Sequence, residues 1–213
     1  MAIGAHFDDI EIACGGTLAR NVAAGHTVMM LVMSDSGYSN FDGEVLRTSE
    51  QALEEGGSAA QILGVGNVQV LDFPTKDVPY NSSSVEAIEK SLRQFEPDII
   101  LTHWVFDTHQ DHRNTGQATI SAARNFNNIL MYEPFPPSGR SYLPFQAQAY
   151  VDITDKISTK LDSLKAHHSQ YVKYGKEHWL EAIKGRARLR GFECGHEYAE
   201  AFQALRIDLG SFL

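Results

Sequence analysis

The chain has 213 residues, of which 18 are lysine or arginine and 27 are aspartate or glutamate, so its formal net charge at pH 7 is −9. This length suffices for one large domain with its own core, and no shift in composition divides it, which predicts a single domain over residues 1–213. The net negative charge argues against nucleic acid as the main partner, because phosphate binding needs a basic face. An anionic small molecule stays open, since a single arginine could hold it.

The cysteines and the apolar runs bear on where the protein resides. Cys14 and Cys194 form no spacing motif, and Cys14 lies in an apolar stretch that favours a small core residue. Without a leader peptide or an apolar run near about eighteen residues, we expect a cytoplasmic protein with no membrane span. Only Ala2 to Ala5 can form a strand before His6. So short a first strand leads us to expect that the native chain starts a few residues earlier.

Apolar segments of two kinds alternate along the first half of the chain. Four segments predict strands, because each is a short apolar run beside polar or turn-forming residues: 2–5, 27–33, 68–73 and 98–104. Three segments between them predict helices, because their apolar residues follow a helical period: 11–25, 45–63 and 83–95. The run over 27–33 is almost continuously apolar, which is typical of a strand buried on both faces.

The second half of the chain continues this alternation. Helices are predicted over 114–123, from Thr154 or Asp155 to about His167, and over 176–190. Strands are predicted over 129–133, 147–153 and 200–207. Proline and glycine are frequent between Pro134 and Pro144, which predicts an irregular loop. Because strand and helix alternate four times, we expect an α/β fold whose parallel sheet is covered by helices on both faces.

Polar residues collect where the first four predicted strands end. In sheets of this kind, ligands bind at the carboxyl ends of the strands. The four ends read “HFDD” (6–9), “SDSG” (34–37), “DFP” (72–74) and “HWVFDTHQDH” (103–112). The sequence therefore predicts a site on this edge of the sheet.

Two of these ends carry residues that can hold a metal ion. The fourth end places two histidines and two aspartates within six residues: Asp107, His109, Asp111 and His112. Imidazole and carboxylate ligands together suit zinc or a similar ion, and a catalytic zinc typically has three protein ligands and an open position for water. His6, Asp9 and His112 would supply such a set. Asp8 would then lie beside the metal, free to act as a base.

The glycines after the first strand allow another interpretation. The stretch “CGGTLA” follows a strand, as a dinucleotide-binding turn does, but the G-x-G-x-x-G spacing is absent. We therefore expect Gly15 and Gly16 to let the first helix pack closely on the sheet.

The two polar ends resemble a known family. “AHFDDIEIACGG” (5–16) and “THQDHR” (108–113) resemble the signature motifs of the LmbE-like (PIG-L type) zinc-dependent N-deacetylases, A-H-P-D-D-E or A-H-P-D-D-x-E and H-x-D-H. The resemblance spans most of the chain and includes an R-x-x-E pair, here Arg47 and Glu50. It implies a Rossmann-like three-layer sandwich with a mostly parallel central sheet, forming a single deacetylase domain.

The resemblance also implies roles for individual residues. His6 and Asp9 match the first two zinc ligands and His112 the third, with one Zn²⁺ per chain. Asp8 matches the general base. His109 matches the histidine that, when protonated, stabilises the oxyanion and assists the leaving amine.

Further residues are candidates for orientation or substrate binding. Asp111 would orient an imidazole, and Arg47 matches a substrate-binding arginine. Asp35 could either hold a turn or reach the substrate, and His168 could reach the site from the C-terminal part. His103 is expected to be a core histidine. Three aromatic residues could line a sugar site or pack in the core: Tyr38, Trp104 and Phe106.

Two departures from the family pattern stand out. Phe7 replaces the usual proline, and Asp107 and Thr108 stand where some relatives have a mobile tyrosine. Neither change touches a matched ligand. The family reaction is hydrolysis of an N-acetylated amino sugar, often carried on a nucleotide, a lipid or a glycoside, which yields acetate and a free amine. The resemblance is also compatible with a homo-oligomer.

Two other functions remain as alternatives. “DTHQDH” is one substitution from the H-x-H-x-D-H signature of metallo-β-lactamase-like hydrolases, but these have a sandwich of two mixed sheets. A Rossmann-like binding protein with an inactive site is the non-enzymatic alternative. Metal content separates them, because we expect one ion per chain for a deacetylase, two for a β-lactamase-like enzyme and none for a binding protein.

Overall fold

A computed structural model describes residues 1–211 of the chain. Its strands are β1 (Ala2–Gly4), β2 (Met29–Ser34), β3 (Tyr38–Ser39), β4 (Val45–Arg47), β5 (Asn67–Phe73), β6 (Ile100–His103), β7 (Ile129–Tyr132), β8 (Ala149–Asp152) and β9 (Ala199–Arg206). Its α-helices are α1 (Asp9–Ala23), α2 (Ser49–Leu63), α3 (Ser82–Phe95), α4 (Gln110–Ala122), α5 (Ile157–Ala166), α6 (His168–Lys173) and α7 (Glu177–Cys194). Two short 3₁₀ turns are η1 (Thr154–Lys156) and η2 (Leu209–Ser211).

A seven-stranded sheet in the order β5-β2-β1-β6-β7-β9-β8 forms the centre of the molecule. The first five strands run parallel, and β9 is antiparallel to both of its neighbours. After β1 the chain moves outward to β2 and β5, and it then returns to β6 on the other side of β1. The point between β1 and β6 is therefore the topological switch point, where ligands bind in such sheets.

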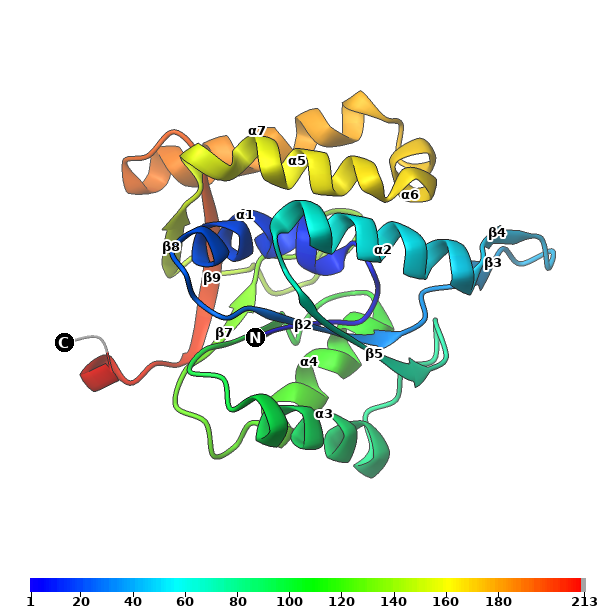
Figure 1. Ribbon diagram of the computed structural model, residues 1–213, viewed down its shortest axis with the longest axis horizontal. Coiled ribbons are helices and arrows are strands. Elements are labelled where there is room, and N and C mark those ends of the chain that lie inside the picture. Colours follow the sequence, from blue (N-terminus) through cyan, green and yellow to red (C-terminus); the bar gives the residue numbers. More distant parts are fainter. Residues whose placement is uncertain (212–213) are drawn as a thin grey trace.

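Helices cover both faces of this sheet, which confirms the predicted α/β fold with a mostly parallel central sheet. Helices α1 and α2 lie on one face, and α3 and α4 lie on the other (Figure 1). On the first side α5 packs on α1 and α2, and α7 contacts α5 and β9. The C-terminal helices thus add an outer tier above α1 and α2, which the expected three layers did not include.

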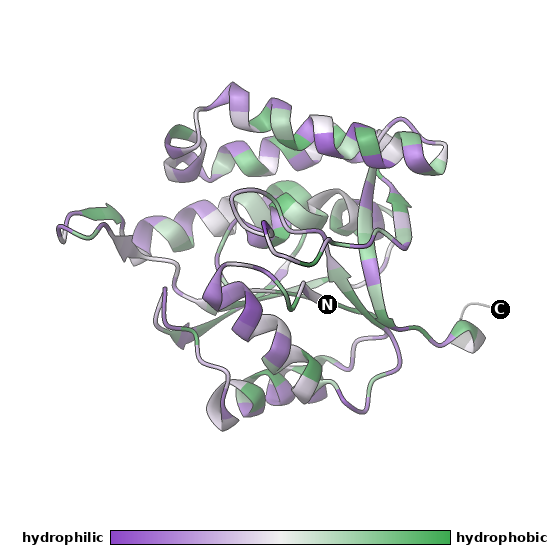
Figure 2. Cartoon of the chain, turned by 180° about the vertical axis from the view of Figure 1, so that it is seen from behind, coloured by the Kyte–Doolittle hydropathy of each residue, from purple (hydrophilic) through white to green (hydrophobic). Residues whose placement is uncertain are grey.

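The alternation of side chains along β2 explains why its run is continuously apolar. Met30 and Val32 join the core cluster that contains α1 residues, while Leu31 and Met33 join the cluster that contains α3 and α4 residues. All six residues of β2 are buried, as predicted for a strand covered on both faces. Figure 2 shows the central strands mainly as hydrophobic, whereas the outer helices alternate between hydrophobic and hydrophilic residues.

Several element boundaries differ from the sequence predictions. The helix predicted over 45–63 begins only at Ser49, because the Thr48 side chain caps it by accepting the Gln51 N–H, and β4 precedes it. The helix predicted from residue 114 begins at Gln110, so its first turn carries part of the second motif. The helix predicted from Thr154 or Asp155 begins only at Ile157, because residues 154–156 form η1, and the short helix α6, which was not predicted, follows soon after its end at Ala166.

The first glycine pair is only partly needed for close packing. A Cβ on Gly16 would lie 2.8 Å from the Ile153 side chain, whereas a Cβ on Gly15 would make ordinary contacts. The tightest glycine is Gly56 in α2, where a Cβ would lie 2.1 Å from the Phe7 ring. Phe7, which replaces the family's proline, is buried and therefore depends on Gly56 for its space. Among the described residues, no helix combines the length and the apolar character needed to cross a membrane.

Candidate metal centre and active site

The two motifs meet at the switch point because β1 and β6 are neighbours in the sheet. Residues 5–8 form the turn from β1 into α1, whose first residue is Asp9, and residues 104–109 lead from β6 into α4. Asp8 in the first turn has a φ of 101°, a strained value for a residue other than glycine. Such strain is common at functional sites, where the surrounding structure holds it in place.

Three potential ligand atoms converge around the Asp9 carboxylate. His6 Nδ1 lies 3.3 Å from Asp9 Oδ2, and His112 Nε2 lies 3.1 Å from Asp9 Oδ1. The three residues form one of the groups whose ligand atoms all lie within 4.8 Å of one another. The structure therefore brings together the set expected from the sequence.

The outer nitrogen of each of these imidazoles is held by another carboxylate. His6 Nε2 lies 2.9 Å from Asp111 Oδ2, and His112 Nδ1 lies 3.0 Å from Asp107 Oδ2. Both carboxylates are buried. Such carboxylate–imidazole pairs orient metal-binding histidines and fix their tautomers. The inner nitrogens are thereby left facing the Asp9 carboxylate.

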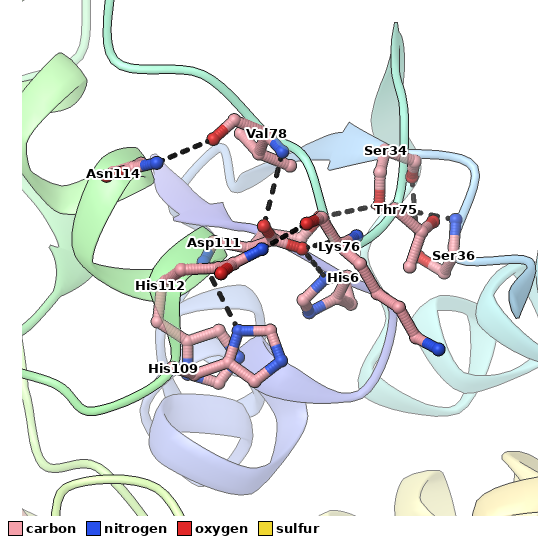
Figure 3. Close-up of polar contacts among 12 residues, drawn as sticks. His6, Ser34, Ser36, Thr75, Lys76, Val78, His109, Asp111, His112 and Asn114 are labelled. Atoms are coloured by element: carbon pink, nitrogen blue, oxygen red, sulfur yellow. Dashed lines mark hydrogen bonds and ion pairs between the residues drawn. The ribbon is translucent and has the colours of Figure 1, made fainter. Parts of the chain in front are cut away.

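Asp111 is itself anchored by the backbone of the loop after β5. Its Oδ2 accepts the Lys76 N–H at 2.7 Å, and its Oδ1 accepts the Val78 N–H at 3.2 Å. Figure 3 shows Asp111 between this loop and the His6 ring, with Asn114 bound to the Val78 carbonyl. The carboxylate is therefore fixed from two sides, as a group that orients His6 must be.

Two other groups of side chains could geometrically hold an ion. One consists of His6, His109 and Asp111, and the other of His103, Asp107 and His112. In the first, the Asp111 carboxylate is already occupied by two backbone N–H groups and an imidazole. In the second, His103 Nε2 accepts the Ala5 N–H at 3.0 Å, so its lone pair is engaged. In the set around Asp9, Oδ2 accepts the His6 backbone N–H at 2.8 Å, but Asp9 Oδ1 and the inner nitrogens of His6 and His112 remain available.

The charges around this set favour a cation. Burial lowers the pKa of His6, but its hydrogen bonds with Asp111 and Asp9 outweigh burial and raise the pKa to about 9. Burial likewise lowers the pKa of His112, but the charge of Asp9 and the bond to Asp107 raise it to about 10. Burial raises the pKa of the Asp9 carboxyl, but the charge of His112 outweighs burial and holds this pKa well below its usual value. The carboxylates thus stabilise positive charge here, as a divalent ion requires.

Asp8 and His109 lie at the same cavity but outside the ligand set. Burial, and then the charge of Asp9, raise the pKa of Asp8 to about 6. Burial, and then the charges of His112 and His6, lower the pKa of His109 to about 4. His109 Nδ1 accepts the Asp111 N–H at 3.2 Å and so caps α4. In the neutral ring the proton is therefore on Nε2, which can donate.

Of the predicted substrate-binding residues, Arg47 lines the cavity and is almost fully buried. Glu50, the other member of the R-x-x-E pair, is exposed, and the guanidinium binds Glu55 instead, with Nη2 2.8 Å from Oε2. Asp35 accepts hydrogen bonds from the Gly37 N–H in its own turn and from the hydroxyl groups of Ser49 and Thr75. His168 is exposed, and neither it nor Asp35 lines the cavity.

The cavity has a volume of about 220 Å³ and continues outward from the ligand set. Besides the motif residues, its walls include the loop 133–138 and two lysines and three aromatic residues: Lys76, Lys173, Tyr38, Tyr174 and Trp179. Phe106 and Trp104, which were candidates for a sugar site, stand next to each other outside this lining, with ring centroids 5.6 Å apart.

Sequence reasoning missed several residues of the site. Asp107 was recognised as part of the His/Asp cluster and as a replacement for a tyrosine, but its contact with His112 was not predicted, although a carboxylate five residues before a candidate ligand histidine could have indicated it. His103 was expected in the core; it is buried, but its ring also stacks on His112 with centroids 4.2 Å apart. His167 had no sequence pattern, yet it is buried between Glu11 and Arg47.

Comparisons with known proteins agree with this arrangement. The family model described as GlcNAc-PI de-N-acetylase (PIG-L) matches residues 1–123. Diacetylchitobiose deacetylase of Thermococcus kodakarensis is 30% identical over 217 residues, covering 95% of this chain and 81% of that protein. The uncharacterized deacetylase YaiS of Escherichia coli strain K12 is 34% identical over 176 residues, covering 79% of this chain and 90% of that protein. The crystal structure of the conserved protein TT1542 from Thermus thermophilus has a TM-score of 0.82 at 25% identity and covers 98% of this chain and 94% of that one.

The matched range of the family model includes both motifs and more than half of the chain. Both curated relatives are described as deacetylases, which indicates a hydrolytic enzyme. The described residues form one mostly parallel sheet and a small two-stranded hairpin, whereas a β-lactamase-like fold has two mixed sheets. The chain therefore belongs to the PIG-L (LmbE-like) family.

Proposed function

We propose that the chain is a zinc-dependent N-deacetylase that removes the N-acetyl group of an amino sugar and releases acetate and a free amine. The observation that carries this proposal is the convergence of His6 Nδ1, the Asp9 carboxylate and His112 Nε2, with the buried Asp8 carboxylate at the same cavity. The deacetylase descriptions of the two relatives support the reaction type.

The chemistry of the donor set fits one zinc ion. Two imidazoles and one carboxylate are typical ligands of catalytic zinc, which keeps a further position open for water or substrate. Asp111 and Asp107 fix the outer nitrogens of His6 and His112, so the inner nitrogens are preorganised for the ion. When bound, such an ion lowers the pKa of its water and polarises the substrate carbonyl.

Two residues outside the ligand set would assist the reaction, Asp8 by proton transfer and His109 by a hydrogen bond. Asp8 is ionised at neutral pH, and its raised pKa of about 6 brings it close to the working range of a general base. It would accept a proton from the attacking water. His109 has its ring proton on Nε2, so it would act as the neutral imidazole and not in the protonated form that the resemblance implied: Nε2–H can donate a hydrogen bond to the carbonyl oxygen, and the proton accepted by Asp8 would pass to the departing amine.

The walls of the cavity support a sugar-like substrate. Within residues 1–211 the buried Arg47 Nε–H has no hydrogen-bond partner, so this guanidinium can still donate to a ligand. Tyr38, Tyr174 and Trp179 provide aromatic surface beside it. We propose a GlcNAc-type sugar, either free or as part of a nucleotide sugar or glycoconjugate.

The test is acetate release by the zinc-loaded protein over a panel of N-acetylated sugars, nucleotide sugars and glycosides. We expect release from at least one member and one zinc ion per chain by elemental analysis. His112→Ala should lose most of its zinc and its activity while retaining the fold. A protein that binds a sugar without zinc and releases no acetate would be a binding protein, and two ions per chain would contradict the proposed centre.

A further inference from the structure

A buried polar cluster lies behind the first motif and joins four parts of the fold. Its members are Glu11 from α1, Arg47 from β4, Glu55 from α2 and His167 from the junction of α5 and α6. The side chains of Glu11 and His167 are fully buried, and those of Arg47 and Glu55 are 2% and 8% exposed. Buried charges of this kind are stable only when each is paired or hydrogen-bonded.

The donors in this cluster determine the tautomer of His167. Arginine has only donors, so the contact of 3.2 Å between Arg47 Nη2 and His167 Nδ1 requires that Nδ1 accept. The ring proton then lies on Nε2 and is donated to Glu11 Oε1 at 2.9 Å. Burial lowers the pKa of His167, and Glu11 raises it above its ordinary value. A second proton, however, would lie on Nδ1 against the guanidinium, so the neutral ring is the form that fits these contacts.

The Nη1 group of Arg47 reaches the turn that contains Asp8, the proposed general base (the catalytic turn). Arg47 Nη1 donates to the Phe7 carbonyl at 3.3 Å, and this carbonyl belongs to the peptide bond that precedes the strained Asp8. Arg47 and Asp8 both line the cavity, whereas His167 does not. Any effect of His167 on the substrate must therefore pass through Arg47 or through the turn that Arg47 holds.

We propose that His167 is a positioning residue, which fixes the Arg47 guanidinium against the catalytic turn and towards the substrate. This inference rests on the proposed deacetylase function. The alternative is that His167 only fills space and compensates the buried Glu11 carboxylate, whose Oε2 has no partner among the described residues. The positioning role requires Nδ1, which accepts from Arg47, whereas compensation of Glu11 requires Nε2. Substitutions that retain only one of these nitrogen positions therefore separate the two roles.

Two substitutions retain one nitrogen position each. In His167→Asn the amide oxygen lies near the former Nδ1 and can still accept from Arg47, while the contact with Glu11 is lost. In His167→Gln the longer side chain reaches towards Glu11, while the acceptor for Arg47 is lost. We expect His167→Gln to raise KM roughly tenfold or more, the usual effect of losing a hydrogen bond to a charged group, with kcat reduced less. His167→Asn should stay within about threefold of the wild type.

A double-mutant cycle tests whether His167 acts through Arg47. In the Arg47→Ala background, His167→Gln should cause almost no further loss of kcat/KM, because residues that act as one unit are not additive. His26→Gln, the same exchange at an exposed histidine, is the matched control and should leave the kinetics unchanged. Zinc content should be unaffected in every variant.

The results separate this inference from the proposed function. If the wild type releases acetate but His167→Gln keeps the wild-type KM, or if the losses in the cycle multiply in full, the positioning role is wrong and the deacetylase function stands. If the wild type releases no acetate from the panel, both fail. A measurement on the unmodified protein covers variants that do not fold: ¹⁵N NMR should show His167 as the neutral Nε2–H tautomer, and a proton on Nδ1 would overturn the inference.

Discussion

The packing of Phe7 on Gly56 gives a quantitative prediction that two adjacent glycines can test. Gly56 and Gly57 both lie inside α2, where an alanine is favoured over glycine by ~1 kcal/mol. A Cβ on Gly57 would meet nothing within 4 Å. A Cβ on Gly56 would lie 2.1, 2.3 and 2.6 Å from three atoms of the Phe7 ring, and that ring is only 1% exposed. The same substitution should therefore have opposite effects at the two positions.

The magnitudes follow from the two opposing contributions. Gly57→Ala should stabilise the protein by ~1 kcal/mol, which raises Tm by ~2–4 °C in a chain of this size. In Gly56→Ala the favourable propensity is outweighed, because overpacking costs about 1–3 kcal/mol or more when no neighbour can give way. We expect a net loss of ~1–2 kcal/mol and a Tm lower by roughly 2–8 °C. Urea and thermal unfolding followed by circular dichroism measure both.

The Phe7→Ala background shows whether the Phe7 ring causes the destabilisation by Gly56→Ala. Phe7→Ala removes the opposing atoms and should itself destabilise the protein by ~3–5 kcal/mol, because it leaves a cavity. Measured against that variant, Gly56→Ala should no longer destabilise, since the added methyl occupies part of the cavity. The explanation is refuted if Gly56→Ala is as stable as Gly57→Ala in the wild-type background, or if its cost is the same with and without the ring.

Three further predictions concern the proposed centre. Asp8→Asn should lower kcat by roughly 10²–10⁴-fold, the usual share of a general base, while the zinc content stays at one ion per chain. Asp9→Asn should instead lose zinc first and regain part of its activity in excess zinc. The reverse pattern would exchange the roles of Asp8 and Asp9. Asp107→Asn should weaken zinc binding by ~10–100-fold, because it removes the carboxylate that orients His112, as measured by competition with a chelator; unchanged affinity would argue against that role. Arg47→Ala should raise KM for the N-acetyl substrate without changing zinc content, and equal kinetics would restrict Arg47 to its contact with Glu55.

Local patterns were enough to predict the elements that bring the motifs together. The apolar run of β2, the repeated alternation of strand and helix, and the polar ends of the strands all depend on neighbours in sequence, and the structure has the corresponding sheet. The boundaries were harder, because caps decide them. Thr48 starts α2 just after Arg47, so the helical i, i+3 relation that would have paired Arg47 with Glu50 does not apply. The guanidinium instead binds Glu55, which lies five residues further along the helix than Glu50.

His167 could not be predicted, for a related reason. It lies 156 residues from Glu11 and 120 residues from Arg47, and its position depends on how α5 packs over α1 and α2. No spacing within the chain encodes such a contact. Sequence reasoning instead favoured the neighbouring His168, which the fold leaves exposed. Helix packing determines that His167 is buried near the site and that His168 is exposed, and this packing is visible only in the fold.

The hydrogen bonds at the switch point explain why neither motif could form this centre alone. The first motif provides His6 and Asp9, but the orientation of His6 depends on Asp111 from the second motif, 105 residues away. The second motif provides His112, whose inner nitrogen faces Asp9 of the first. The second half therefore contributes the proposed ligand His112 with its own orienting carboxylate, Asp107, and also Asp111, which orients the proposed ligand His6 of the first half. A chain with only the first motif would lack the carboxylate that orients His6, and a chain with only the second would lack the Asp9 carboxylate, so the pair of motifs on adjacent strands, more than either signature, specifies the site.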